Sequence, residues 1–329
     1  MEPTPKVDLE TLSDLATPWC VHVVATLRIA DHLAAGVTDL QGLATAAGCD
    51  PGALHRVLGH LVGKGMFEEP APGRFALNDP ARELLEASPF LDLDGIGGRF
   101  AAAWGTLLGY VRTGRPGYAG LFGRPFWEDL AAHPDLAETF DDLMGPAGHG
   151  PPDPRIPLAG GWERVRAVVD VGGGTGAMLA ALLRAHPHLR GTLVDVPATV
   201  ARAAATFQAA GVAHRVKTAG QSFFDPLPAG ADVYLLRKVL NDWPDAETVA
   251  ILRRCAEAAH PGGRVVVLGG VTAEDEPWRL TVETVLLGGT TSTLPEFREL
   301  ARQAGLEVTA ATPQAGRLVV ECRPVVGGT

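Results

Sequence analysis

A glycine-rich segment follows a short apolar run in the second half of the chain. The run ends at Asp170, and the residues from Asp170 to Gly176 read DVGGGTG. Glycines allow a tight turn from strand to helix and let backbone N–H groups approach a ligand closely. The acid precedes the glycines, where it suits a cationic amino-acid group better than the pyrophosphate of a dinucleotide. The glycines alone are a weak signal, because a turn that binds nothing can look similar.

A second acid strengthens this interpretation. Asp195 closes the next expected strand, GTLVDV, where its carboxylate can accept hydrogen bonds from ribose hydroxyls. These residues together predict a ligand with a nucleoside at one end and a cationic amino-acid sulfonium at the other. Asp195 would bind the nucleoside, and Asp170 and the glycines the cationic end.

The elements that position these residues alternate between strands and helices from Arg166 onward. The expected strands are RAVVDV, GTLVDV, ADVYLL and GGRVVVLGG, and helices are expected to begin near Gly176, Pro197, Asp245 and Thr293. Such alternation predicts a mostly parallel sheet. The final pair, LEVTAAT and RLVVECRP, is too close in sequence for a helical crossover, so the last strand should be antiparallel.

Residues 1–90 are predicted to form short amphipathic helices followed by a wing strand, GRFALND. Helix–turn–helix followed by a wing is the order of a winged helix. His55, Arg56, His60 and Lys64 share one helix and could bind DNA. The chain has 28 basic and 38 acidic residues and a net charge of -10, which disfavours phosphate backbones. A dimerisation module is therefore the preferred interpretation.

Residues 91–160 are expected to form a helical substrate-pocket and linker region, and residues 161–329 the nucleoside-binding domain. The stretch FWEDLAAHPDLAETFDDLM is the clearest helical pattern, and a Gly- and Pro-rich stretch follows it. Candidate pocket residues are Trp104, Phe126, Phe140 and Met144. Their aromatic character favours a flat, aromatic or polyketide-like substrate, although each would also suit a core.

Sequence patterns that are absent from the chain argue against several classes of protein and of binding site. The sequence contains no 18-residue apolar run, so no bilayer-spanning helix is expected. The start of the chain does not resemble a signal peptide, and the four cysteines are scattered, as in a cytoplasmic protein. No HExxH pattern is present, so no metal site is expected. Neither nucleic acid nor membrane is an expected partner.

The motifs DVGGGTG, LVDVP, SFFDPLP, VLNDWPD and GGTTSTLPEFRELARQAGLE resemble the plant-type small-molecule O-methyltransferase family. The nearest likeness is to bacterial members of polyketide and enediyne pathways, among them naphthoate- and carminomycin-modifying methyltransferases and an aclacinomycin hydroxylase. The resemblance covers nearly the whole chain. It implies a class I methyltransferase fold behind a winged-helix-like domain, and a homodimer. It also implies S-adenosylmethionine as cofactor and S-adenosylhomocysteine as product.

Residue by residue, the resemblance implies a cofactor site. Its methionine end would be lined by Asp170, Gly172 and Gly174, its ribose held by Asp195, and its adenine flanked by Ser222 and Phe223, with Arg237 where some relatives have Lys. Many relatives carry Asp in place of Ser222. Trp243 would either pack beside the cofactor or belong to the core.

The family's catalytic base is missing. Plant-type members use a His before the Asp-Trp pair, and here that position is Asn241. The two acids that orient this His are replaced by Gly269 and Thr291. A neutral amide accepts and donates hydrogen bonds but takes no proton at working pH.

Two other side chains, Glu283 and His149, are candidates to replace the base. Glu283 could act if it faces the pocket, and would otherwise be a surface or paired carboxylate. His149 lies in the Gly- and Pro-rich loop, where a solvated His is common. Asp242 adjoins Asn241 but is expected to point another way.

Three functions follow from these residues. The first is methyl transfer by proximity and orientation: a general base contributes ~10²–10⁴-fold, whereas orientation reaches effective molarities of ~10⁵–10⁸ M. The second is a cofactor-binding but non-methylating tailoring enzyme, such as a hydroxylase, pericyclase or decarboxylase. The third is a ligand-sensing DNA-binding regulator.

Overall fold

The computed structural model describes residues 8–144, 151–260, 262–273, 280–314 and 317–325. The chain divides into two compact units, Met1–Ala102 and Ala103–Thr329. The division falls within helix α7 (Ile96–Trp104). The domain boundaries expected after residues 90 and 160 remain predictions.

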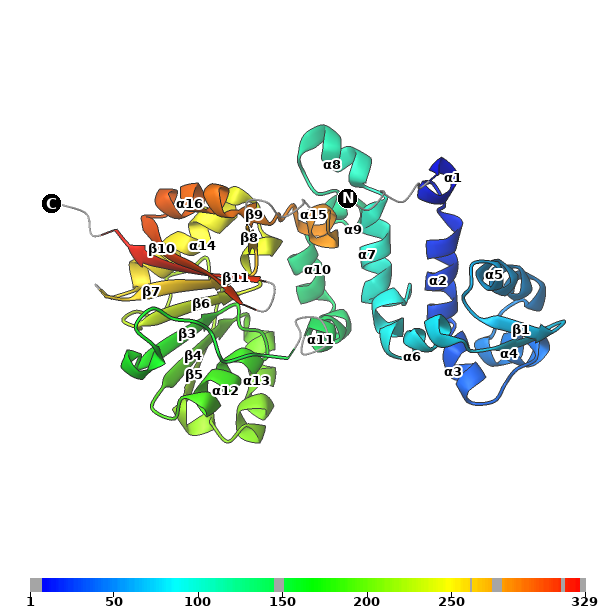
Figure 1. Cartoon of the computed structure of the whole chain (residues 1–329), viewed down its shortest axis with the longest axis horizontal. Coiled ribbons are helices and arrows are strands. Elements are labelled where there is room, and N and C mark those ends of the chain that lie inside the picture. Colours follow the sequence, from blue (N-terminus) through cyan, green and yellow to red (C-terminus); the bar gives the residue numbers. More distant parts are fainter. Residues whose placement is uncertain (1–7, 145–150, 261, 274–279, 315–316, 326–329) are drawn as a thin grey trace, which may run out of the picture. The chain divides into compact units, whose positions relative to one another are not determined.

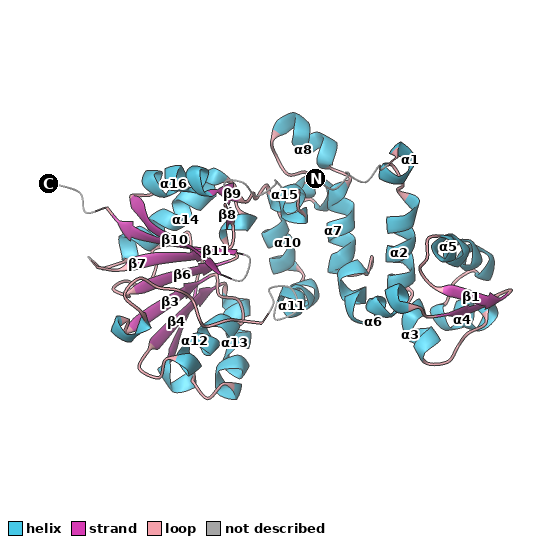
Figure 2. Ribbon diagram, in the orientation of Figure 1, coloured by secondary structure: helices cyan, strands magenta, loops and turns pink. Residues whose placement is uncertain are grey.

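The first unit is a small helical bundle with a two-stranded wing (Figure 2). Its elements are α1 (Leu9–Leu12), α2 (Ala16–Thr26), α3 (Ile29–Ala34), α4 (Leu40–Ala47), α5 (Pro51–Gly63), β1 (Glu68–Ala71), β2 (Arg74–Ala76) and α6 (Asp79–Leu91). Asp50 caps α5, because its carboxylate accepts a hydrogen bond from the Ala53 N–H. The antiparallel pair β1–β2 follows α4 and α5, which is the order expected from the sequence.

The second unit opens with short helices. They are α8 (Leu107–Thr113), α9 (Tyr118–Phe122), α10 (Phe126–Ala132) and α11 (Pro134–Asp142). The helical pattern expected from Phe126 onward is interrupted at His133. Pro134 has no N–H to continue α10, and instead occupies the first turn of α11, where no donor is needed.

The rest of the second unit is built on a seven-stranded sheet of order β10-β11-β7-β6-β3-β4-β5. The strands are β3 (Ala167–Val171), β4 (Arg190–Asp195), β5 (Val216–Gly220), β6 (Val233–Arg237), β7 (Arg264–Leu268), β10 (Leu306–Gln314) and β11 (Arg317–Pro324). The first five are parallel, and β11 runs antiparallel to both β7 and β10. This arrangement confirms the predicted class I methyltransferase fold, including its antiparallel last strand.

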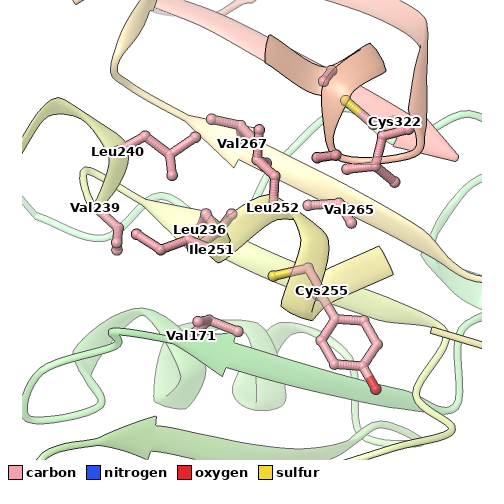
Figure 3. Packing of buried hydrophobic residues seen from close by; sticks show 14 of the residues in the cluster. Val171, Leu236, Val239, Leu240, Ile251, Leu252, Cys255, Val265, Val267 and Cys322 are labelled. Carbon is pink, nitrogen blue, oxygen red and sulfur yellow. The ribbon is translucent and has the colours of Figure 1, made fainter. Parts of the chain in front are cut away.

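Helices cover both faces of the sheet. Helices α12 (Ala177–Ala185) and α13 (Pro197–Ala209) pack on one face, and α14 (Asp245–Ala258) and α16 (Leu294–Gln303) on the other (Figure 1). Successive strand residues therefore enter different cores: Val168 packs with the α12 side and Val169 with the α14 side. Figure 3 shows the α14 side, where Ile251 and Leu252 lie among strand residues such as Val267.

Smaller elements complete the unit. They are the 3-10 helices η2 (Trp162–Arg164), η3 (Ala213–Arg215) and η4 (Leu240–Asp242), the helix α15 (Val282–Leu287), and the parallel pair β8 (Val271–Thr272) and β9 (Ser292–Thr293). Helix α15 packs against η4. None of the helices in the described ranges has both the length and the hydropathy to cross a bilayer.

Candidate active site

The glycine-rich segment forms the turn between β3 and α12. Gly172 has φ +67° and Gly174 has φ +60°, conformations that other residues rarely adopt. A Cβ on Gly172 would lie 2.8 Å from Val239 Cγ2 and 3.4 Å from the ring of Phe223. The turn therefore needs glycine both for its backbone conformation and for its closeness to the neighbouring side chains.

Asp170 is completely buried at the end of β3. Neither carboxylate oxygen has a hydrogen-bond partner among the described residues. Burial raises the pKa of Asp170 to about 7, the Arg237 guanidinium lowers it, and the Asp195 carboxylate raises it. Two buried acceptors without donors are unusual in a folded protein and fit a site for a cationic ligand group.

Asp195 closes β4 and faces the glycine turn. Its Oδ2 accepts a hydrogen bond from the Gly174 N–H at 2.8 Å, and its Oδ1 accepts one from the Val196 N–H at 2.8 Å. Burial raises the pKa of Asp195, and the two N–H groups lower it. The structure thus brings the second predicted acid to the turn that carries the first.

Phe223 and Ser222, which are proposed to flank the adenine, differ in their exposure to solvent. The Phe223 ring lies beside Gly172 and makes an edge contact with Trp243, with ring centroids 5.8 Å apart. Ser222 is exposed, and its hydroxyl accepts a hydrogen bond from the Phe224 N–H at 3.2 Å. Phe223 is therefore an apolar wall of the turn, and Ser222 lies at the surface.

Arg237 ends β6, the strand next to β3. Burial lowers the pKa of its guanidinium, and Asp170 raises it. The structure therefore couples Arg237 electrostatically to the acid of the glycine motif.

Asn241 lies in η4, just beyond β6. Its Nδ2 donates a hydrogen bond to Asp242 Oδ1 at 2.8 Å, whereas its Oδ1 is buried without a partner in the described part of the chain. The expectation that Asp242 points away from Asn241 was wrong. Sequence adjacency gives opposite directions in a strand, but the tight 3-10 turn brings the two side chains together.

The positions of the family's two orienting acids also lie near this turn. A Cβ on Gly269 would lie 3.2 Å from Lys238 Cγ, so the Lys238 stem passes where the side chain of an acid would begin. Thr291 is partly buried just before β9. Neither residue supplies a carboxylate, as the sequence indicated.

Glu283 lies in the first turn of α15 and is partly buried. Burial and the Glu283 carboxylate raise the pKa of Asp242 well above its usual range, and Lys238 lowers it. The structure therefore places Glu283 in the electrostatic surroundings of Asp242, one residue from Asn241.

An aromatic cluster extends from α9 to α11. Phe126 is almost fully buried and contacts Trp127 and Phe140 at centroid distances of 5.1 Å and 5.5 Å. Trp127 also stacks with Trp243, with centroids 6.3 Å apart and planes 21° from parallel. Phe126 is thus a core residue of the cluster, and the Trp127–Trp243 contact, which the sequence did not predict, connects the cluster to the segment that follows Asn241.

The remaining pocket candidates are less constrained. Trp104, at the end of α7, is 40% exposed, and Met144 is partly buried. The indole N–H of Trp127 is buried and has no acceptor among the described residues.

His149, a candidate substitute for the base, falls outside the described residues. No group of three or more potential metal ligands occurs within the described ranges.

Two family descriptions match the chain. Residues 9–87 match the O-methyltransferase dimerisation domain, and residues 104–307 match the O-methyltransferase domain. The two matches together span most of both compact units.

Two characterised proteins are similar over almost their whole length. The 2,7-dihydroxy-5-methyl-1-naphthoate 7-O-methyltransferase of Streptomyces carzinostaticus is 42% identical, with 96% of this chain and 97% of the relative covered. The aclacinomycin 10-hydroxylase RdmB of Streptomyces purpurascens is 41% identical, with coverages of 94% and 87%.

A solved structure agrees with these relatives. The O-methyltransferase NcsB1 of neocarzinostatin biosynthesis, solved with S-adenosylhomocysteine and 1,4-dihydroxy-2-naphthoic acid, is similar with a TM-score of 0.89 and 39% identity. The similarity covers 98% of this chain and 100% of that one. The chain therefore belongs to the O-methyltransferase family, and its cofactor is S-adenosylmethionine.

Proposed function

We propose that the protein transfers a methyl group from S-adenosylmethionine to a flat aromatic acceptor of secondary metabolism. The observation that carries this proposal is the fully buried Asp170 carboxylate, without a hydrogen-bond partner in the described residues, beside a glycine turn held by Asp195. Asp170 would hold the cationic amino-acid end, and Asp195 the ribose. Phe223 would pack against the adenine side.

When bound, S-adenosylmethionine supplies a methyl carbon on a positively charged sulfur. The acceptor atom forms a bond to that carbon, the carbon–sulfur bond breaks with its electron pair left on sulfur, and the acceptor's proton passes to water. Asn241 cannot take this proton, so its role is to orient the acceptor. Orientation can supply more rate acceleration than the missing base, by effective molarities of ~10⁵–10⁸ M.

The substrate class follows from the side chains near Asn241. Trp127 and Trp243 offer flat apolar surfaces. Within the described residues, the Trp127 N–H has no acceptor and Asn241 Oδ1 has no donor. An aromatic ring that carries a hydroxyl and a carbonyl or carboxylate matches that set. The relative of Streptomyces carzinostaticus is named for a dihydroxynaphthoate, and NcsB1 was solved in complex with 1,4-dihydroxy-2-naphthoic acid.

The protein is proposed to be a homodimer. Apolar side chains at the start of the dimerisation domain are strongly exposed: Leu9 by 79%, Leu12 by 72%, Leu15 by 75% and Trp19 by 49%. A row of large exposed apolar residues marks an interaction surface, and a second copy of the chain would cover it.

We further propose a cytoplasmic protein that does not bind nucleic acid. The net charge of -10 opposes binding to phosphate backbones. A fluorescence-anisotropy titration with duplex DNA at low salt checks this; salt-sensitive binding would favour the regulator instead.

A non-methylating reaction is the second candidate. Asn241, Gly269 and Thr291 lack the acid–base chemistry of plant-type members, and one relative of 41% identity is a hydroxylase. This candidate predicts turnover of an acceptor without formation of S-adenosylhomocysteine.

One experiment separates the two candidates. The purified protein is incubated with methyl-labelled S-adenosylmethionine and a panel of hydroxynaphthoic acids and anthracyclines. Methyl transfer predicts labelled product and an equal amount of S-adenosylhomocysteine, both lost in Asp195→Ala. Turnover of an acceptor without label would overturn the first proposal and support the second.

A further inference from the structure

The side-chain amide of Asn241 has a fixed direction. Its Nδ2 donates to Asp242 Oδ1 at 2.8 Å. Burial and the Glu283 carboxylate raise the pKa of Asp242 and Lys238 lowers it, so this direction holds at a pH where Asp242 is ionised and its carboxylate offers only acceptors. Turning the amide by 180° would bring Asn241 Oδ1 against a carboxylate oxygen, with two acceptors facing each other. The contact with Asp242 therefore decides which end of the amide remains available.

The available end is the carbonyl oxygen. Asn241 Oδ1 is buried and has no donor among the described residues. A buried acceptor without a donor is costly, so a ligand that supplies an N–H or O–H at this point gains a hydrogen bond that the protein has already oriented. A ligand that presents another acceptor or an anion at the same point meets repulsion instead.

The surrounding backbone keeps this arrangement in place. Gly289 lies so close to the backbone of η4 that a Cβ there would overlap the backbone carbonyl oxygen of Asn241 and lie 2.6 Å from the backbone carbonyl carbon of Asp242. Helix α15 also packs on η4 and carries Glu283. This close contact restrains the backbone of η4, from which the Asn241 and Asp242 side chains project.

We propose that Asp242 is a positioning residue that presents the Asn241 carbonyl oxygen to the acceptor, so that the site selects aromatic acceptors carrying a neutral hydroxyl or N–H group. This inference rests on the proposed function, because it assumes that the acceptor binds beside Asn241. It excludes acceptors that enter as carboxylates or phenolates at the reacting atom. A carboxylate elsewhere on the ring is compatible with it.

The test uses the full-length protein saturated with S-adenosylhomocysteine. Calorimetry compares the affinities of 2-naphthol and 2-fluoronaphthalene, which share ring and size but differ in donating a hydrogen bond. The wild-type protein is expected to prefer the naphthol by about 5–10-fold, the value of one ordinary hydrogen bond.

Three substitutions test the role of Asp242. Asp242→Asn keeps the size but offers both a donor and an acceptor, so the Asn241 amide can turn, and the preference should fall to within about 2-fold. Asp242→Glu retains a carboxylate and should restore part of the preference. Asp245→Asn, which neutralises an exposed acid at the start of α14, is the matched control and should leave the preference unchanged.

The experiment distinguishes failure of this inference from failure of the proposed function. Retention of the wild-type preference in a folded Asp242→Asn protein would overturn the inference and leave Asp242 as a purely structural residue. Should this variant fail to fold, the Asn241→Leu protein decides, because the naphthol preference must disappear when the carbonyl oxygen is removed. Lack of any S-adenosylhomocysteine binding by the wild-type protein would contradict the proposed function itself.

Discussion

Replacing Asp170 by Asn should stabilise the ligand-free protein while weakening cofactor binding. Asp170→Asn keeps the shape of the side chain and removes a buried charge. Burial raises the pKa of Asp170 from 3.8 to about 7. This difference in pKa between the folded and unfolded states corresponds to about 4 kcal/mol.

The direction of this stability change follows from the protons bound by the folded and unfolded states. Because the pKa is higher in the folded state than in the unfolded state, the folded protein is favoured at low pH and loses that stability as the pH rises from about 4 to about 7. The neutral amide does not ionise. Asp170→Asn should therefore raise the free energy of unfolding at pH 8 by up to about 4 kcal/mol, and by less at pH 6.

Urea unfolding at pH 6 and pH 8 measures this difference, and calorimetry measures the affinity for S-adenosylmethionine. The variant should bind the cofactor at least about 10-fold more weakly, since a charge-assisted hydrogen bond is lost. Asp232→Asn is a control that should lower the free energy of unfolding. The Asp232 carboxylate accepts backbone hydrogen bonds at 2.7 Å from Arg166 and 2.9 Å from Ala167, which the substitution weakens. An Asp170→Asn protein that is less stable at pH 8 and binds the cofactor normally would refute this reasoning.

Three further perturbations test other parts of the site. Asn241→Ala should lower kcat by about 10–100-fold with unchanged affinity for S-adenosylhomocysteine, in steady-state kinetics and calorimetry; an unchanged kcat would remove Asn241 from the site. Gly172→Ala places a Cβ 2.8 Å from Val239 at positive φ, so thermal unfolding should show a loss of about 1–3 kcal/mol and calorimetry a loss of cofactor affinity; wild-type values would contradict the strained turn. Leu12→Asp with Leu15→Asp should shift the dimer to monomer in light scattering, and a persisting dimer would place the interface elsewhere.

The sequence was sufficient for the parts of the fold with strong local signals. The glycine turn and Asp195 follow buried apolar strands, and the ends of parallel strands meet at one edge of a sheet, so their proximity could be predicted. Strand β5 could not be predicted, because this edge strand has the pattern VKTAG, with two partly buried and three exposed residues, and lacks an apolar run.

The candidate catalytic site was harder to predict. The direction of Asp242 depends on a 3-10 turn of three residues, and the stacking of Trp127 on Trp243 joins segments far apart in sequence. Periodicity carries no information on either contact. The absence of the family's base, by contrast, could be seen from Asn241 in the sequence alone.

Binding of S-adenosylhomocysteine tests the central claim most directly. Calorimetry on the purified wild-type protein is predicted to give one site per chain, with binding strongly reduced in Asp195→Ala. A flat titration with both S-adenosylhomocysteine and S-adenosylmethionine would contradict the account.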